Sequence, residues 1–368
     1  MDNRSAAFPV VIKLAKLALT TTIIAGAIRI ARERRRMEFD GKTVLISGAS
    51  RGLGLELARA FAEEGADLVL LARDQARLTQ TAKELQRYGI KVLTYPCDVS
   101  QRTQVREVIG DVLAKARRID VLINNAGMIQ VGPVENMDVS DYESTMGVHF
   151  WGPLYLMEEI IPNMKSFGHG RIVNIASIGG KVAVPHLLPY AASKFALVGL
   201  SEGMRAELLK DGIYVTTICP GLMRTGSHVH ALFKGQHKKE YALFAIANAS
   251  PLLSTASAHA AQEILEACRY GKAEVIITAQ ARLLRLANGL FPTLVAETLG
   301  LVGRLLPRPR EGTGNHSKEG WESGSVLAPS LLTRPADRAA AHNNELSTSA
   351  SSFLTVDLPI ARDATDSS

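Results

Sequence analysis

Short apolar runs alternate with longer amphipathic stretches between residues 42 and 278. The runs are five or six residues long and rich in β-branched side chains, which is typical of buried strands. The stretches between them repeat their apolar positions with a period near 3.6, as amphipathic helices do. This alternation predicts βαβ units and an α/β domain built on a mostly parallel sheet. The predicted strands are residues 43–47, 67–72, 91–96, 120–124, 171–176, 213–218 and 274–278, and the clearest helices are 53–64, 74–88 and 101–116.

The N-terminal segment has a different pattern. Residues 8–28 are mostly apolar, but only residues 17–28 lack charge, about half of the roughly 20 residues that a bilayer helix needs. The full stretch is long enough only if Lys13 and Lys16 extend toward the lipid headgroups. We therefore expect a membrane-spanning helix or an amphipathic helix lying on the membrane. A cleaved signal peptide ending near Ala27 is disfavoured by the basic cluster that follows.

The C-terminal part divides into two regions. Residues 281–306 are rich in leucine and interrupted by Pro292, which predicts a helix pair that either packs on the domain or covers a pocket or touches lipid. From residue 307 onward the chain is rich in Pro, Ser, Thr, Ala and charged residues without a hydrophobic period, so we predict disorder. The expected organisation is a membrane-associating segment (1–36), an α/β domain (37–280), an apolar helical extension (281–306) and a disordered tail (307–368).

Composition and charge narrow the class of protein. Apolar residues make up 46% and charged residues 21%, the proportions of an ordinary globular protein. The three cysteines (Cys97, Cys219 and Cys268) are far apart and form no CxxC pair, so the sequence supports neither a disulfide framework nor a thiolate zinc site. The net charge of +6 resides in residues 1–36, where eight basic side chains face two acidic ones. This distribution favours an anionic membrane surface as partner over nucleic acid, and the positive-inside rule places the domain on the cytoplasmic side.

A glycine-rich loop follows the first predicted strand. Its sequence is Gly-Ala-Ser-Arg-Gly-Leu-Gly, from Gly48 to Gly54, and a helical pattern begins at once. Glycines let the backbone turn tightly and approach a pyrophosphate, which the free N–H groups and positive dipole end of the helix then bind. The position between strand and helix indicates a dinucleotide site.

Charge at the end of the second strand indicates which dinucleotide binds. NAD sites place a carboxylate there against the ribose 2′-hydroxyl, whereas this chain has Ala72 followed by Arg73. Arg51 and Arg73 together can hold a 2′-phosphate by charge-assisted hydrogen bonds, which predicts NADP(H). The alternative is that both arginines are solvated surface charges. Asp74 is expected to be a helix N-cap rather than the missing acid.

Three side chains have the chemistry for carbonyl reduction. Tyr190 and Lys194 are four residues apart and share one helix face, and Ser177 follows a strand at the carboxyl edge of the sheet. Reduction needs a proton donor beside the carbonyl oxygen, and the reverse oxidation needs the same group as a base. An ammonium group about 4 Å from the phenol would lower the pKa of Tyr190 toward the working pH. Each feature alone is common, so the prediction depends on their joint occurrence after the glycine loop.

With the runs Asn-Asn-Ala-Gly at 124–127, Tyr-Ala-Ala-Ser-Lys at 190–194 and Pro-Gly at 220–221, the chain closely resembles the short-chain dehydrogenase/reductase family over about residues 40–280. The resemblance implies a doubly wound, Rossmann-type α/β domain, hydride transfer with a nicotinamide cofactor, no metal and a homo-oligomer. Asp98 would bond the adenine amino group and Lys194 the nicotinamide ribose. The cofactor residues expected in all are Gly48, Ser50, Arg51, Gly52, Leu53, Gly54, Arg73, Asp98, Val99, Asn125, Ala126, Gly127, Tyr190, Lys194, Pro220, Gly221 and Thr225.

One position departs from the family pattern. Many members have an asparagine on the helix after the Asn-Asn-Ala-Gly run, where its main-chain carbonyl holds a water of the proton relay. Here that position is His149. Its side chain either joins the relay as a catalytic residue, since a free imidazole titrates near 6.5, or replaces the asparagine structurally.

The substrate region corresponds to residues 226–253, which form a mobile lid in the family. His228, His230 and His237 occur there without carboxylate or cysteine partners at ligand spacing, so we predict a polar loop and no metal. An oily pocket is predicted from Leu187, Leu188, Leu222, Met223, Leu232 and Phe233. These residues favour a lipophilic ketone or secondary alcohol, such as a steroid, retinoid or acyl-chain carbonyl, over a sugar. The alternative is a non-catalytic nucleotide-binding regulator or scaffold.

Overall fold

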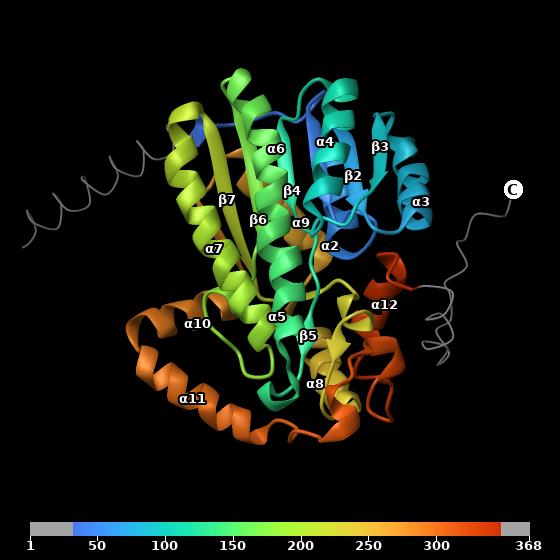
Figure 1. Cartoon of the computed structure of the whole chain (residues 1–368), viewed down its shortest axis with the longest axis vertical. Coiled ribbons are helices and arrows are strands. Elements are labelled where there is room, and N and C mark those ends of the chain that lie inside the picture. Colours follow the sequence, from blue (N-terminus) through green and yellow to red (C-terminus); the bar gives the residue numbers. More distant parts are fainter. Residues whose placement is uncertain (1–31, 347–368) are drawn as a thin grey trace, which may run out of the picture.

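The computed structural model describes residues 32–346, and a seven-stranded parallel sheet forms its centre (Figure 1). The strand order is β11-β7-β6-β4-β1-β2-β3. Each of the seven predicted strands is confirmed to within two residues at either end. Their bounds are β1 (Thr43–Ser47), β2 (Asp67–Ala72), β3 (Val92–Pro96), β4 (Val121–Asn124), β6 (Gly170–Ile175), β7 (Ile213–Pro220) and β11 (Glu274–Ile277).

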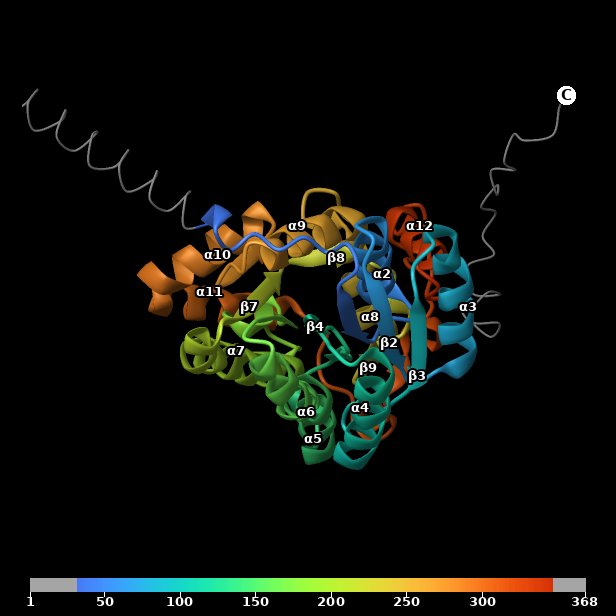
Figure 2. The ribbon, with the colours of Figure 1, turned by 90° about the horizontal axis from the view of Figure 1, so that it is seen from above.

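Helices cover both faces of this sheet. Viewed from above, α4 (Arg102–Ala116), α6 (Gly152–Ser166) and α7 (Leu188–Leu208) lie on one side, and α2 (Gly52–Glu63) and α9 (Ser257–Arg269) on the other (Figure 2). Successive strand residues point to opposite faces. Val44 and Ile46 therefore pack with α2 and α9, while Leu45 packs with α4 and α6. Burial on both faces explains why the strands read as continuous apolar runs.

The strand order reverses between β1 and β4, which creates the crevice where ligands bind in open α/β sheets. Beyond that edge lie short elements that the hydrophobic pattern did not predict. They are the strands β5 (Gln130–Val131), β8 (Leu222–Arg224), β9 (Leu232–Phe233) and β10 (Ser254–Ala256), and the helices α5 (Val139–Met146) and α8 (His237–Ala249). The predicted cap of α3 (Gln75–Leu85) is confirmed, because the carboxylate of Asp74 accepts a hydrogen bond from the amide of Arg77 at 3.0 Å.

The predicted helix pair consists of α10 (Ala279–Leu290) and α11 (Pro292–Leu305). Pro292 begins the second helix, as a residue without an N–H can. Both helices keep large apolar side chains exposed, among them Leu286, Leu294 and Leu305. Between residues 32 and 346, no helix is both long enough and apolar enough to span a bilayer. The apolar stretch for which we predict a membrane helix lies outside the described residues.

The prediction of a disordered tail from residue 307 is wrong for the part that the structure describes. Residues 318–346 contain β12 (Lys318–Glu319) and α12 (Arg334–His342), and Thr333, Asp337 and Asn343 are buried. This segment is held by hydrogen bonds to distant parts of the domain and by small buried side chains such as Ala336 and Ala340. Its composition is polar and the apolar side chains that it buries are mostly small, so the sequence pattern does not reveal it. Residues 347–368 lie outside the described residues.

Candidate active site

The glycine loop is shaped by close backbone contacts. Gly48 has a φ of +65°, and a Cβ there would lie 2.8 Å from the Cα of Ala126. A Cβ on Gly54 would collide with the carbonyl oxygen of Gly48. The side-chain amide of Asn125 donates to the carbonyl oxygens of Ser47 and Gly48, both at 3.1 Å, and joins the two loops. The cradle at the start of α2 therefore has room for backbone only, as a pyrophosphate site requires.

Three predicted catalytic side chains converge beyond this cradle. Ser177 comes two residues after β6, and its Oγ accepts a hydrogen bond from the amide of Gly179 at 3.0 Å. Tyr190 and Lys194 lie one turn apart on α7, and the Tyr190 phenol forms a side-chain hydrogen bond with Ser177. Lys194 Nζ donates to the carbonyl oxygen of Ile175 at 2.8 Å and lies 5.7 Å from the Tyr190 ring centroid.

Burial dominates the electrostatics of this pair. It raises the pKa of Tyr190, and the hydrogen bond from Ser177 opposes that rise. Burial also lowers the pKa of Lys194 to about 7. The predicted lowering of the Tyr190 pKa by the lysine charge is therefore wrong for the polypeptide alone. The attraction between the two groups is outweighed by the cost of removing both from water, which their spacing in the sequence does not reveal.

His149 lies in the π-helical segment Gly147–Trp151, behind Tyr190 rather than in the cavity. Its Nε2 accepts a hydrogen bond from the amide of Met128 at 3.2 Å, so Nδ1 carries the proton and donates to Ser193 Oγ at 2.8 Å. Ser193 in turn donates to the carbonyl oxygen of Tyr190 at 2.8 Å. Burial, with the nearby charge of Lys194, lowers the pKa of His149 well below its ordinary value. The imidazole is therefore neutral and joins the Asn-Asn-Ala-Gly loop to α7.

Basic side chains surround the cradle. Arg51 Nε lies 3.4 Å from Glu345 Oε2, and Arg73 is exposed after β2. Arg77 was missed by the sequence analysis. Burial lowers the pKa of Arg77, and the nearby positive charge of Arg51 lowers it further. The sequence contains one signal for a role of Arg77 at this site. Arg77 lies one turn after the Asp74 cap, and that turn follows the carboxyl end of β2.

The other predicted cofactor residues follow the carboxyl ends of the strands. The carboxylate of Asp98, after β3, accepts hydrogen bonds from Ser100 N at 3.0 Å and Ser100 Oγ at 2.7 Å. The carboxyl ends of parallel strands share one edge of the sheet, so the loops after them meet around the crevice. That edge carries Ser50, Gly52, Leu53, Val99, Gly127, Pro220, Gly221 and Thr225.

A largely apolar cavity of about 330 Å³ opens beside Ser177 and Tyr190. Leu187, Leu222 and Met223 line it, as the sequence predicts. Leu188, Leu232 and Phe233 do not, because Leu188 is exposed and the other two lie on or beside the separate core around Tyr241. Its other apolar walls were not predicted, because nothing in the sequence shows that their elements return to the site. They are Ile129, Ile178, Val184, Phe244, Leu253, Ala281 and Leu284.

The three histidines of the lid region have partners that spacing did not reveal. His228 Nε2 lies 3.2 Å from Asp337 Oδ1, His230 Nδ1 lies 2.8 Å from Glu319 Oε2, and His237 Nδ1 lies 3.0 Å from Ser323 Oγ. The expectation that they lack carboxylate partners is wrong for the first two. Their partners come from the C-terminal segment, 86 to 109 residues away.

Comparison with known proteins is consistent with this geometry. The family model described as short chain dehydrogenase matches residues 42–233. Dehydrogenase/reductase SDR family member 7B of Danio rerio is 39% identical over 210 residues, which cover 55% of this chain and 68% of that protein. 17-beta-hydroxysteroid dehydrogenase 13 of Homo sapiens is 30% identical over 220 residues, covering 58% and 73%. The structure of L-sorbose reductase from Gluconobacter frateurii, complexed with NADPH and L-sorbose, is similar with a TM-score of 0.59 and 26% identity, covering 66% of this chain and 97% of that one.

Proposed function

Because the chain belongs to the short-chain dehydrogenase/reductase family of oxidoreductases, we propose that it interconverts a lipophilic ketone or aldehyde and the corresponding alcohol with NADP(H). One observation carries the proposal. Ser177 and Tyr190 meet at an apolar cavity, Lys194 lies one helical turn further along, and the glycine cradle opens at the same sheet edge. A regulator that only bound a nucleotide would need the cradle but not this group of side chains.

The reaction steps follow from the positions of the side chains. A bound nicotinamide supplies the hydride that the polypeptide lacks. A substrate carbonyl oxygen in the cavity accepts hydrogen bonds from Ser177 and Tyr190, which both line it. The Tyr190 proton passes to that oxygen as the carbon is reduced, and solvent restores it; in alcohol oxidation the phenolate accepts the proton. Lys194 in its charged form stabilises the phenolate, and His149 is a positioning residue that holds the backbone of Tyr190 through Ser193.

The lining of the cavity supports a lipophilic substrate. Its walls are mainly Leu, Ile, Val, Met and Phe side chains, and Ser177 and Tyr190 are among the few polar groups that line it. Such a lining stabilises an apolar body and directs one oxygen toward the catalytic hydroxyls. The human relative is named as a hydroxysteroid dehydrogenase.

A carbonyl panel tests the proposal. Purified full-length protein with NADPH is expected to oxidise the cofactor with steroid, retinoid or long-chain acyl carbonyls, and far more slowly with L-sorbose. NADPH consumption at 340 nm and product detection by mass spectrometry measure this. Turnover confined to sugars would contradict the lipophilic substrate. Tight NADPH binding without turnover on any carbonyl would support the regulator instead.

The nucleotide preference gives a second prediction. Replacing both Arg51 and Arg73 with alanine is expected to raise the Kd for NADPH about a hundredfold relative to that for NADH, because each charge-assisted hydrogen bond contributes roughly 1.5–3 kcal/mol. Isothermal titration calorimetry with both nucleotides measures the ratio. Arg106→Ala, which removes an exposed arginine of α4, is the matched control. Equal losses for NADPH and NADH would exclude a 2′-phosphate site at this pair.

We also propose that the N-terminal segment associates with membranes and leaves the domain on the cytoplasmic side. Its apolar stretch and its surplus of basic residues support this. Arg32 lies 4.1 Å from the Tyr270 ring centroid and Arg35 lies 5.4 Å from that of Tyr214, so the last part of the basic cluster packs on the domain. A variant lacking residues 2–31 keeps these contacts and is expected to stay in the soluble fraction during flotation with anionic vesicles, whereas the full chain floats. A full chain that stays soluble would contradict the proposal.

A further inference from the structure

The C-terminal strap, which we define as residues 333–346, crosses the mouth of the glycine cradle. Figure 1 shows its helix α12 beside α8, on the side of the molecule where α2 begins. A buried polar contact holds it there, because Asp337 Oδ1 lies 3.2 Å from His228 Nε2, and within the strap Thr333 Oγ1 donates to Asp337 Oδ2 at 2.7 Å. A Cβ on Gly226 would overlap Ala340, so the helix packs directly on the loop that follows Thr225.

The segment after α12 accepts a hydrogen bond from the backbone of the glycine cradle. The carbonyl oxygen of Asn343 accepts from the amide of Gly52, the first residue of α2, at 2.9 Å. The side chain of Asn343 is fully buried and donates to the carbonyl oxygen of Thr225 at 3.2 Å and to Ser257 Oγ at 3.1 Å. One asparagine thus joins the glycine loop to the loop that is expected to hold the nicotinamide end.

An anionic side chain of the strap lies against the basic groups of the cradle. Glu345 is 3% exposed, with Oε2 3.4 Å from Arg51 Nε, and its Oε1 lies 2.7 Å from where a Gly52 Cβ would be. The first turn of α2 contains no acidic residue of its own. Helix N-termini favour anions, so a strap carboxylate lies where a phosphate is expected. Next to it, Arg77 donates to the carbonyl oxygen of Asn344 at 3.1 Å.

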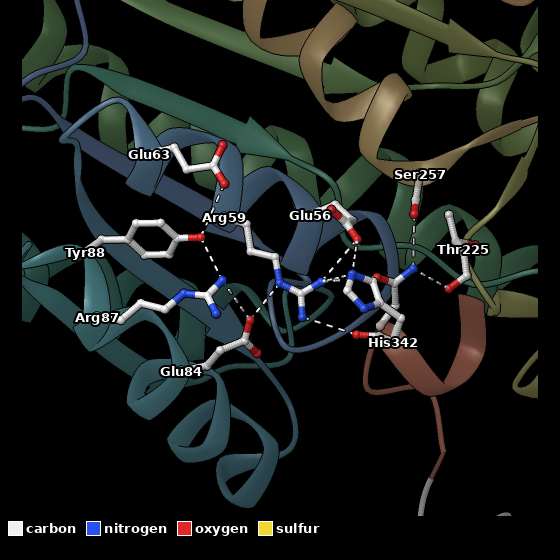
Figure 3. A network of polar contacts seen from close by, with 10 residues as sticks. Glu56, Arg59, Glu63, Glu84, Arg87, Tyr88, Thr225, Ser257 and His342 are labelled. Carbon is white, nitrogen blue, oxygen red and sulfur yellow. Dashed lines mark hydrogen bonds and ion pairs between the residues drawn. The ribbon is translucent and has the colours of Figure 1, made fainter. Parts of the chain in front are cut away.

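A second network fixes the strap from outside the cradle (Figure 3). Arg59 of α2 donates to His342 Nε2 at 3.1 Å, to the His342 carbonyl oxygen at 3.2 Å and to Asn343 Oδ1 at 3.4 Å. Glu56 and Glu84 hold the same guanidinium, at 3.1 and 2.7 Å. The strap is thus anchored both at Gly52, the first residue of α2, and at Arg59, about two turns further along the same helix.

From these contacts we infer that the strap is an intramolecular competitor for the dinucleotide site, which must leave the cradle before cofactor binds. The inference rests on the proposed function, since the strap contacts Gly52 and Arg51, which are expected to bind the cofactor. The carbonyl oxygen of Asn343 occupies the single N–H of Gly52, and the Glu345 carboxylate fills the space beside Gly52 and Arg51, so a cofactor phosphate at the start of α2 has to displace the strap. The apparent Kd for NADPH then equals the intrinsic Kd divided by the fraction of molecules with the strap open.

The test uses the full chain with Asn343→Ala and Glu345→Ala combined, and Glu311→Ala as the control, because Glu311 is an exposed acid earlier in the C-terminal segment. Calorimetry is expected to give an NADPH Kd about tenfold lower for the double variant than for wild type, and an unchanged Kd for the control. Hydrogen exchange of the unmodified chain provides a second readout. NADPH is expected to protect peptides covering residues 48–55 while residues 340–346 lose protection.

The failures are distinguishable. An equal Kd for wild type and double variant, with residues 340–346 still protected at saturating NADPH, would overturn the strap inference and leave the proposed function standing. Failure of NADPH to bind wild type and double variant alike would overturn the proposed function and the inference with it. If the double variant does not fold, the exchange measurement on the unmodified chain decides alone.

Discussion

Replacing Tyr190 with phenylalanine is expected to lower kcat by about a thousandfold, the order of magnitude that general acid–base catalysis contributes. Phenylalanine keeps the ring but removes the hydroxyl that bonds Ser177 and faces the cavity. The substrate oxygen would then lose its proton donor, while the glycine cradle stays intact. Initial rates of NADPH oxidation with an accepted substrate, together with calorimetric NADPH binding, measure the two effects separately.

The control for this prediction is Tyr155→Phe. Tyr155 stacks on Trp151 through rings 6.0 Å apart and is not among the residues that line the cavity. It is expected to keep wild-type kcat. A Tyr190→Phe protein that binds NADPH normally and retains more than about a tenth of wild-type kcat would exclude Tyr190 as the acid.

The second large effect concerns stability and pH. Lys194 is 4% exposed, and burial lowers its pKa to about 7, whereas an unfolded lysine titrates near 10.4. At pH values between these two pKa values, the Lys194 side chain is protonated in the unfolded chain and neutral in the folded chain. Raising the pH from 7 to 10 therefore favours the folded state, and below pH 7 the full cost of burying the charge is present.

Lys194→Met removes this titration. The variant is expected to gain free energy of unfolding relative to wild type at pH 7, and this gain should shrink by up to about 1.4 kcal/mol for each pH unit toward pH 10. Urea unfolding of the nucleotide-free proteins at several pH values measures the slope. Lys210→Met, which removes an exposed lysine after α7, is the control. A difference that stays constant between pH 7 and 10 would show that Lys194 keeps its charge in the folded state.

The sheet was predictable because its signal is local. A parallel strand buried on both faces must be apolar along its length, so β1 and β2 appear in the sequence with the bounds that the structure has. The cap at Asp74 and the helix break at Pro292 are local in the same sense. The short strands β5 and β9 could not be predicted, because two residues carry no period and their pairing spans distant parts of the chain.

The grouping of Ser177, Tyr190 and Lys194 was predictable for a related reason. Helical spacing places Tyr190 and Lys194 on one face, and the ends of parallel strands bring Ser177 to the same edge as the glycine loop. The ionisation of this group was not predictable. Whether an ammonium lowers the pKa of a phenol depends on how far both are removed from water, and that is decided by every element packed around them.

Sequence alone thus determined the doubly wound sheet, the glycine cradle and the meeting of Ser177, Tyr190 and Lys194 at one sheet edge, because periodicity and short spacings encode contacts between neighbours along the chain. Tertiary structure alone decided most of the walls of the cavity, the neutral state of His149 and the position of the C-terminal strap on Gly52 and Arg51. These features depend on partners that are distant in sequence. Such contacts form only once the core has brought the partners together. A polar segment such as residues 343–345 has no hydrophobic pattern from which these contacts could be predicted.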